Sequence, residues 1–163
     1  VLGAKGLAIG KSLIEENIFP EVKKMEITNP KLHIPVDVIL SEDKNGQAEN
    51  RVGPVGKIGD QELIWDIGPE TIEIFEAIIR KSKTVVWNGP MGYFETEEFG
   101  RGTKKIAEII ASADCYSVVG GGETTCLLEK MGIIEKFSHV STGGGAMLEF
   151  LSGDKLPGIA VLD

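Results

Sequence analysis

The 163-residue sequence has few cysteines and histidines, the residues that build disulfide frameworks and many metal cages, and it has no long apolar run. Its two cysteines, Cys115 and Cys126, form no C-x-x-C pair, and its two histidines, His33 and His139, have no Cys or acidic neighbours at ligand spacing. We therefore expect reduced thiols, structural histidines and a cytoplasmic location. No run of 18 apolar residues occurs, so no transmembrane helix is expected.

Positive charge is also scarce, with 17 Lys and Arg against 25 Asp and Glu and a net charge of −8. Such a chain is a poor binder of nucleic acid or of an anionic membrane. A small polyphosphate can still bind where backbone N–H groups and a metal ion supply the positive potential. The sequence starts at Val1 with neither an initiator Met nor a signal-peptide pattern, which is typical of a cut end.

Two common phosphate-binding fingerprints are missing. Residues 6–12 resemble a P-loop, but three residues rather than four separate the glycines, and no clear strand precedes them. We expect Ser12 to cap a short helix over 13–16 and a second helical piece to run from Pro20 to about Ile27. The sequence has no plain G-x-G-x-x-G followed by an acidic residue, which disfavours an oxidoreductase with a dinucleotide cofactor.

Strand and helix patterns alternate along the rest of the chain. Helices are expected from Gly68-Pro69 to about Lys83 and over about 97–112, 124–131 and 146–151, and residues 41–60 read as a loop or small hairpin. Strands are expected at 34–40, 84–87, 116–119 and 138–141, with 84–87 buried on both faces. This alternation predicts an α/β fold with a doubly wound parallel sheet between two helical layers, a Rossmann-like arrangement.

Glycine is abundant, with 21 residues, and it clusters in loops 88–92, 120–124 and 141–145. Each loop follows an expected strand, so a parallel sheet brings all three to one edge. Two of them open directly into helices, whose first N–H groups are unpaired and whose dipole attracts anions. A single glycine triplet is typical of a tight turn, but three such loops at one edge favour a phosphate site, because glycine lets a phosphate approach the backbone.

Two acidic residues near these loops have open interpretations. Glu123, at the start of a helix, either holds a Mg²⁺ that bridges phosphates or only complements the helix dipole. Glu95 follows Tyr93-Phe94 and either accepts hydrogen bonds from ribose hydroxyls or is a solvated surface charge.

Three motifs resemble those of one family. Residues 85–95, V-V-W-N-G-P-M-G-Y-F-E, are similar to the W-N-G-P-x-G-x-F-E signature of phosphoglycerate kinases. Residues 120–124 resemble that family's G-G-G-D-[ST] loop, and residues 138–146 match its S-H-[IV]-S-T-G-G-G-A run. The likeness covers essentially the whole chain, which implies a single partial nucleotide-binding domain, residues 1–163, from the C-terminal half of a two-domain kinase.

The resemblance implies ATP or ADP and Mg²⁺ as ligands and phosphoryl transfer with 3-phosphoglycerate. It places Asn88, Gly121, Gly122, Glu123 and Thr124 at the nucleotide, Glu95 at the ribose, Glu123 at the metal, and Gly143, Gly144 and Gly145 at the transferring group as catalytic backbone donors. Two residues depart from the pattern. Glu123 replaces the usual Asp, and Trp65, near the expected adenine slot, is larger than usual and either stacks on the base or narrows the slot.

The family's N-terminal domain and its upstream Gly-Gly-x-Lys segment have no counterpart in the sequence. We therefore expect a fragment that is inactive alone and meets 3-phosphoglycerate only through the absent domain; the alternative is a non-catalytic nucleotide-binding module. Strands 84–87, 116–119 and 138–141 should pair in parallel in that order, with 34–40 apart from them. The bare strand edge between the two groups invites self-association.

Overall fold

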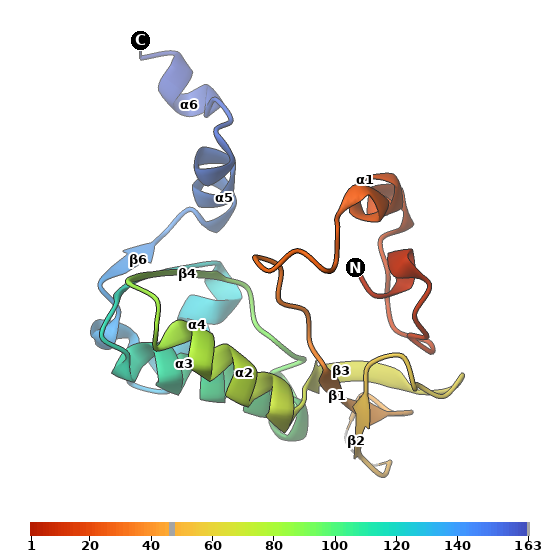
Figure 1. The fold of residues 1–163 in the computed structure, drawn as a ribbon. Coiled ribbons are helices and arrows are strands. Elements are labelled where there is room, and N and C mark those ends of the chain that lie inside the picture. The colour runs from red at the N-terminus through yellow and green to blue at the C-terminus, as the bar shows by residue number, and fades with distance from the viewer. Residues whose placement is uncertain (46–47, 163) are drawn as a thin grey trace. The chain divides into compact units, whose positions relative to one another are not determined.

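A computed structural model describes residues 1–45 and 48–162 (Figure 1). The chain forms two compact units. Unit 1 comprises residues 1–75 and 91–105, and unit 2 comprises residues 76–90 and the described chain from Ile106 onward. Each unit has its own three-stranded sheet.

Unit 1 is built on an antiparallel sheet in the order β2-β1-β3. Its strands are β1 (Asp37–Ser41), β2 (Arg51–Pro54) and β3 (Leu63–Ile67). Val38 and Leu40 of the central strand are buried with Ile58, and Val55 and Ile64 pack against this cluster. The β1–β2 pair confirms the hairpin alternative for residues 41–60, although residues 46 and 47 lie outside the described part of the chain.

The sequence analysis was wrong about the surroundings of β1. It assigned residues 34–40 to the parallel sheet, whereas β1 lies at the centre of the antiparallel one. It also missed β3, which pairs with β1 and contains the buried Asp66. A carboxylate inside a five-residue run interrupts the apolar pattern that marks a strand, and only tertiary contacts show how this one is satisfied.

The N-terminal segment departs from expectation as well. Ser12 caps no helix; its Oγ instead accepts a hydrogen bond from the backbone N–H of Ile64 at 2.8 Å. The helix α1 (Phe19–Lys24) follows a 3-10 turn, Glu16–Ile18, and includes Pro20 in its first turn. Another 3-10 turn, Gly3–Lys5, lies near the N-terminus. A side chain that bonds to a strand is not available to cap its own segment, which explains the failed helix prediction.

Helix α2 (Pro69–Ile79) begins at the predicted Gly68-Pro69 junction. The buried carboxylate of Asp37 accepts hydrogen bonds from the backbone N–H groups of Glu70 and Thr71 and from the Thr71 hydroxyl at 2.7 Å. A carboxylate at this position pairs the otherwise unsatisfied N–H groups of the first turn and complements the helix dipole. The Pro35-Val36-Asp37 motif therefore anchors the start of α2.

Unit 2 contains the parallel sheet, in the order β4-β5-β6. The strands are β4 (Thr84–Asn88), β5 (Tyr116–Gly120) and β6 (His139–Ser141). This order confirms the predicted pairing, and no ladder joins β1 to β4 among the described strands. The remaining elements are the 3-10 turns Glu97–Phe99 and Ile134–Lys136 and the helices α3 (Arg101–Ser112), α4 (Gly122–Lys130), α5 (Gly144–Ser152) and α6 (Pro157–Ala160).

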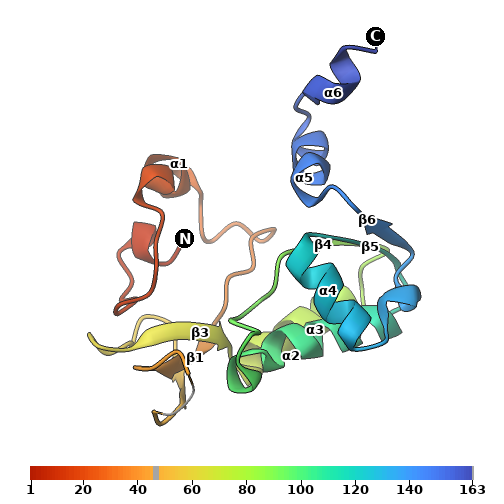
Figure 2. The same ribbon diagram turned by 180° about the vertical axis from the view of Figure 1, so that it is seen from behind.

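Helix α4 lies against the sheet, as Figure 2 shows, and α5 and α6 continue beyond β6. The buried side chains of unit 2 include Trp87, Val119, Ile106, Ile110 and Leu128. The prediction that β4 is buried on both faces is wrong, because Val86 is 44% exposed. Within the described chain β4 is also an edge strand, because it pairs only with β5.

Candidate functional site

The carboxyl ends of the three parallel strands meet in register. Asn88, the last residue of β4, lies beside Gly120, the last residue of β5, which in turn lies beside Ser141 at the end of β6. The three glycine loops therefore leave the sheet at one edge, as the sequence predicted. Ligands of doubly wound sheets bind at this edge.

Two of the loops approach each other as closely as backbones can. A Cβ built on Gly144 would lie 2.5 Å from the backbone nitrogen of Gly121, so no larger residue fits there. Gly121 has a φ of +93°, and a Cβ on it would lie 2.6 Å from Oδ1 of Asn88. Only glycine combines this backbone conformation with this approach.

The side chain of Asn88 links the loops. Its Nδ2 donates a hydrogen bond to the carbonyl oxygen of Gly144 at 3.1 Å, and its Oδ1 lies against Gly121. That Asn88 lies beside nucleotide phosphates stays a prediction of the sequence. The structure shows that its side chain contacts two of the glycine loops at the edge where such phosphates would lie.

Two other glycines at this edge have open space around them. A Cβ on Gly122 or on Gly145 would meet no atom within 4 Å, and neither residue has a positive φ. Neither packing nor backbone conformation therefore requires glycine at these positions. Glycine at such an open position would leave the backbone accessible to a ligand.

Both glycine-led helices present free ends. Gly121 is the N-cap of α4 and Gly143 is the N-cap of α5, and neither helix has a side-chain cap hydrogen bond. The first N–H groups of each helix have no intrahelical partner, and the dipole places partial positive charge there. Such ends bind anions without help from a basic side chain, which suits an acidic chain.

The next two residues of α4 differ in exposure. The side chain of Glu123 is exposed in the first turn, whereas Thr124 is fully buried and its hydroxyl has no hydrogen-bond partner among the described residues. A contact from Thr124 to a ligand would therefore use its backbone N–H. The described residues contain no group of three or more His, Cys, Asp or Glu that could hold a metal. Glu123 would therefore hold Mg²⁺ only together with phosphate oxygens and water, as is usual for this ion.

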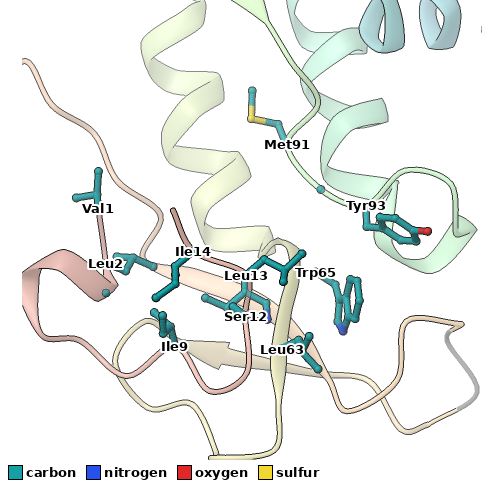
Figure 3. Close-up of a pocket in the computed structure, with 13 residues that line it drawn as sticks. Val1, Leu2, Ile9, Ser12, Leu13, Ile14, Leu63, Trp65, Met91 and Tyr93 are labelled. Atoms are coloured by element: carbon teal, nitrogen blue, oxygen red, sulfur yellow. Dashed lines mark hydrogen bonds between the residues drawn. The ribbon is translucent and has the colours of Figure 1, made fainter. Parts of the chain in front are cut away.

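Unit 1 contains an apolar pocket with a volume of about 500 Å³. Figure 3 shows Trp65 and Tyr93 at one end and Val1, Leu2 and Ile9 at the other. Trp65 is held firmly, because it stacks on Phe99 with ring centroids 5.3 Å apart and its Nε1 donates to the carbonyl oxygen of Ser41 at 3.1 Å.

Tyr93 forms the second aromatic wall of this pocket. Its ring lies 5.4 Å from that of Trp65 at an angle of 58°, a tilted arrangement that aromatic pairs favour. Glu95, two residues further on, is exposed in the same unit. The Tyr93-Phe94-Glu95 segment thus combines an apolar wall with a carboxylate, which suits a ligand that has both a flat ring and hydroxyl groups.

The sequence analysis overlooked the role of Asp66. Its carboxylate is buried at 2% exposure and accepts hydrogen bonds from the backbone N–H groups of Ile67 at 2.8 Å and Gly102 at 2.7 Å. Burial raises the pKa of Asp66 to about 6, and the two N–H donors oppose that rise. The signal available in the sequence was an Asp within an otherwise apolar run, Leu63–Ile67.

Comparison with known proteins agrees with the motifs. The model of the family described as phosphoglycerate kinase matches residues 1–154, which is most of the chain. The chain belongs to the phosphoglycerate kinase family. The matched residues include both glycine-led helices and the apolar pocket.

Individual relatives carry the same name. The phosphoglycerate kinase of Desulfovibrio desulfuricans is 43% identical over 166 residues, covering 99% of this chain and 43% of the relative. That of Rhodococcus opacus is 46% identical over 167 residues, covering 99% of this chain and 41% of the relative. The structure of phosphoglycerate kinase from Coxiella burnetii matches with a TM-score of 0.88 and 39% identity, over 99% of this chain and 43% of that one.

The chain thus spans about two fifths of the length of these phosphoglycerate kinases. They are kinases, and therefore transferases, and the family uses ATP or ADP with Mg²⁺. Among the described helices, none is both long and apolar enough to cross a membrane.

Proposed function

We propose that this chain is the nucleotide-binding part of a phosphoglycerate kinase, the glycolytic enzyme that transfers a phosphoryl group between 1,3-bisphosphoglycerate with ADP and 3-phosphoglycerate with ATP. The observation that carries the proposal is the shared edge of the parallel sheet in unit 2. There, Gly122 and Gly145 have open space where a side chain would be, and two helices present uncapped N-termini.

The glycine loops supply the phosphate contacts. Backbone N–H groups of Gly121, Gly122 and Thr124 at the start of α4 bind nucleotide phosphates, and those of Gly143, Gly144 and Gly145 stabilise the charge that develops on the transferring group. Phosphoryl transfer needs little covalent chemistry from the protein, so positioning and charge stabilisation account for most of the catalysis. Asn88 keeps the two sets of donors at their observed spacing.

The pocket of unit 1 receives the adenine ring. Its walls offer aromatic and aliphatic surface from Trp65, Tyr93 and Ile9, as expected for a site that buries a flat base. Glu95 accepts hydrogen bonds from the ribose hydroxyls. Because one face of Trp65 is already stacked on Phe99, we infer that Trp65 narrows the pocket rather than moving to follow the base.

Glu123 is the residue that would hold Mg²⁺, because its carboxylate is exposed in the first turn of α4. When bound, the ion would supply positive charge beside the nucleotide phosphates of a chain whose net charge is −8.

We infer that the chain alone transfers no phosphoryl group. Donor and acceptor must be aligned at reacting distance, which supplies about 7–11 kcal/mol of barrier lowering. The acceptor, 3-phosphoglycerate, would bind only through the family's N-terminal domain, which has no counterpart in this sequence. A cytoplasmic location, with neither nucleic acid nor membrane as a partner, accords with the acidic charge and two free cysteines.

Separate probes test the apolar pocket of unit 1 and the glycine loops of unit 2. In an NMR titration, magnesium pyrophosphate should perturb residues 120–125 and 141–146, and adenosine should perturb Trp65 and Tyr93. Mg-ADP should perturb both groups and residues 88–95. The absence of any shift at millimolar Mg-ADP would refute nucleotide binding. Binding without phosphoryl transfer, even after the family's N-terminal domain is supplied, would favour the alternative of a non-catalytic nucleotide-binding module.

A further inference from the structure

Asp66 lies where three segments of unit 1 meet. It belongs to β3, accepts a hydrogen bond from Gly102 in the first turn of α3, and lies against Gly92 of the 91–95 segment. A Cβ on Gly92 or on Gly102 would overlap the Asp66 carboxyl group. The same carboxylate thus occupies space that a side chain would need at both glycines.

The 91–95 segment is held at three points around Asp66. The backbone N–H groups of Met91 and Gly92 donate to the buried hydroxyl of Thr103 at 3.0 and 3.2 Å. The N–H of Tyr93 donates to the carbonyl oxygen of Trp65 at 2.8 Å. The third point is the contact of Gly92 with Asp66. The same three anchors therefore determine where Tyr93 stands relative to Trp65.

These two aromatic residues form one end of the pocket in Figure 3. We propose that Asp66 is a positioning residue for this pocket, holding the start of α3 and the 91–95 segment so that Tyr93 and Trp65 stand at the spacing that accepts a nucleotide base. The proposal rests on the nucleotide-binding function proposed above. Asp66 is too deeply buried to reach a ligand, so it acts through Gly92, Gly102 and its own strand.

The protonation state of Asp66 affects which hydrogen bonds it can make. An ionised carboxylate accepts from both Gly102 and Ile67, whereas a protonated one must present its O–H to one of these two donors. The elements around Asp66 carry other charges: Asp37 of β1 is committed to the start of α2, and Glu95, Glu97, Glu98 and Arg101 are exposed. Lys104 and Lys105 lie further along α3. Burial and backbone donors, rather than any of these charges, set the pKa of Asp66.

The test compares D66N with D37N. Both variants change a buried carboxylate that bonds to the first turn of a helix in unit 1, but Asp37 bonds to α2 rather than to α3. In D66N we expect adenosine to bind about tenfold more weakly, because a hydrogen bond to a charged group is lost, while pyrophosphate binding is unchanged. In D37N both affinities should stay at the wild-type level despite reduced stability.

A second measurement needs no ligand. In wild-type protein titrated from pH 5 to 8, the amide of Tyr93 and the indole N–H of Trp65 should shift together with a midpoint near pH 6, and D66N should abolish that midpoint. Absence of this shift in a folded wild-type protein, or wild-type adenosine affinity in folded D66N, would overturn the positioning role. If adenosine binds to none of the proteins while the ligand-free shift is present, nucleotide binding fails and the role of Asp66 in placing the segment stands.

Discussion

Gly121 and Gly144 lie so close together that a methyl group on Gly144 would come within 2.8 Å of the Gly121 Cα. They belong to different glycine loops, and their contact fixes the distance between the starts of α4 and α5. The two triplets, 120–122 and 143–145, therefore each contain glycines that serve packing and glycines that leave the backbone open.

This difference predicts that Ala substitutions at the neighbouring Gly144 and Gly145 have unequal effects on stability. Gly144→Ala should lower the free energy of unfolding by about 1–3 kcal/mol, because the added methyl group overpacks the loop contact. Gly145→Ala should change it by no more than about 1 kcal/mol, since Ala suits a helix better than Gly and meets no neighbour there. Denaturant unfolding measures both.

Mg-ADP binding should respond differently, because Gly145→Ala should weaken binding although it hardly affects stability. Gly145→Ala should weaken Mg-ADP binding by about tenfold or more, equivalent to about 1.4 kcal/mol. Calorimetry on the folded variant checks this value. Unchanged ADP affinity in Gly145→Ala would mean that the open space at this glycine receives no phosphate.

Asn88 should be sensitive to an isosteric change. Asn88→Asp replaces the Nδ2 donor by an oxygen facing the carbonyl of Gly144, and should cost about 1–3 kcal/mol of stability. Asn88→Ala removes the hydrogen bond without adding charge, so it should bind Mg-ADP better than Asn88→Asp does. Equal affinity in the two variants would argue that the side chain lies away from the phosphates.

Glu123 can be tested without disturbing the fold, because its side chain is exposed. In Glu123→Gln, we expect Mg²⁺ to lose its strengthening effect on ADP binding, whereas Glu129→Gln, at the other end of α4, should retain it. In a complete parent enzyme the same change should lower kcat by about 10²-fold. A loss of only about 0.3–1 kcal/mol of stability, with the Mg²⁺ effect intact, would identify Glu123 as a dipole partner alone.

Asp66 predicts a specific dependence of stability on pH. Its pKa is about 6 in the folded chain against an ordinary value of 3.8, so the folded state holds the proton more tightly than the unfolded state. The contribution of Asp66 to the free energy of unfolding is therefore largest below about pH 4. It falls as the pH rises through 6, by about 3 kcal/mol in total. Subtracting the pH profile of D66N from that of the wild type isolates this term; a difference that is flat from pH 4 to 7 would contradict the raised pKa.

The open edge of β4 predicts self-association. Val86 is 44% exposed on a strand whose only ladder partner in the described chain is β5. Unpaired backbone groups on an apolar edge favour pairing with a second copy. Val86→Lys should therefore shift a concentration-dependent dimer toward monomer in sedimentation experiments. Tyr116→Lys, on the adjacent non-edge strand, is the control and should have a smaller effect.

Local patterns in the sequence were enough to predict the parallel sheet and the edge at which its glycine loops meet. Strand periodicity and glycine loops are local signals, and parallel pairing then forces Asn88, Gly120 and Ser141 to one side. The motifs also identified the family, because the spacing of glycine, Asn88 and Glu123 reflects a backbone geometry that few sequences share.

Other features depended on contacts between residues far apart in the chain. Local patterns cannot show that β1 pairs with a strand containing Asp66, that the Oγ of Ser12 bonds to β3 instead of capping a helix, or that Gly121 and Gly144 touch while Gly145 stays open. Whether a polar group is buried, and whether a glycine serves packing or access, depends on what the folded chain places beside it. Those neighbours depend on the folded chain, since a residue's own sequence context says little about which distant residues surround its side chain.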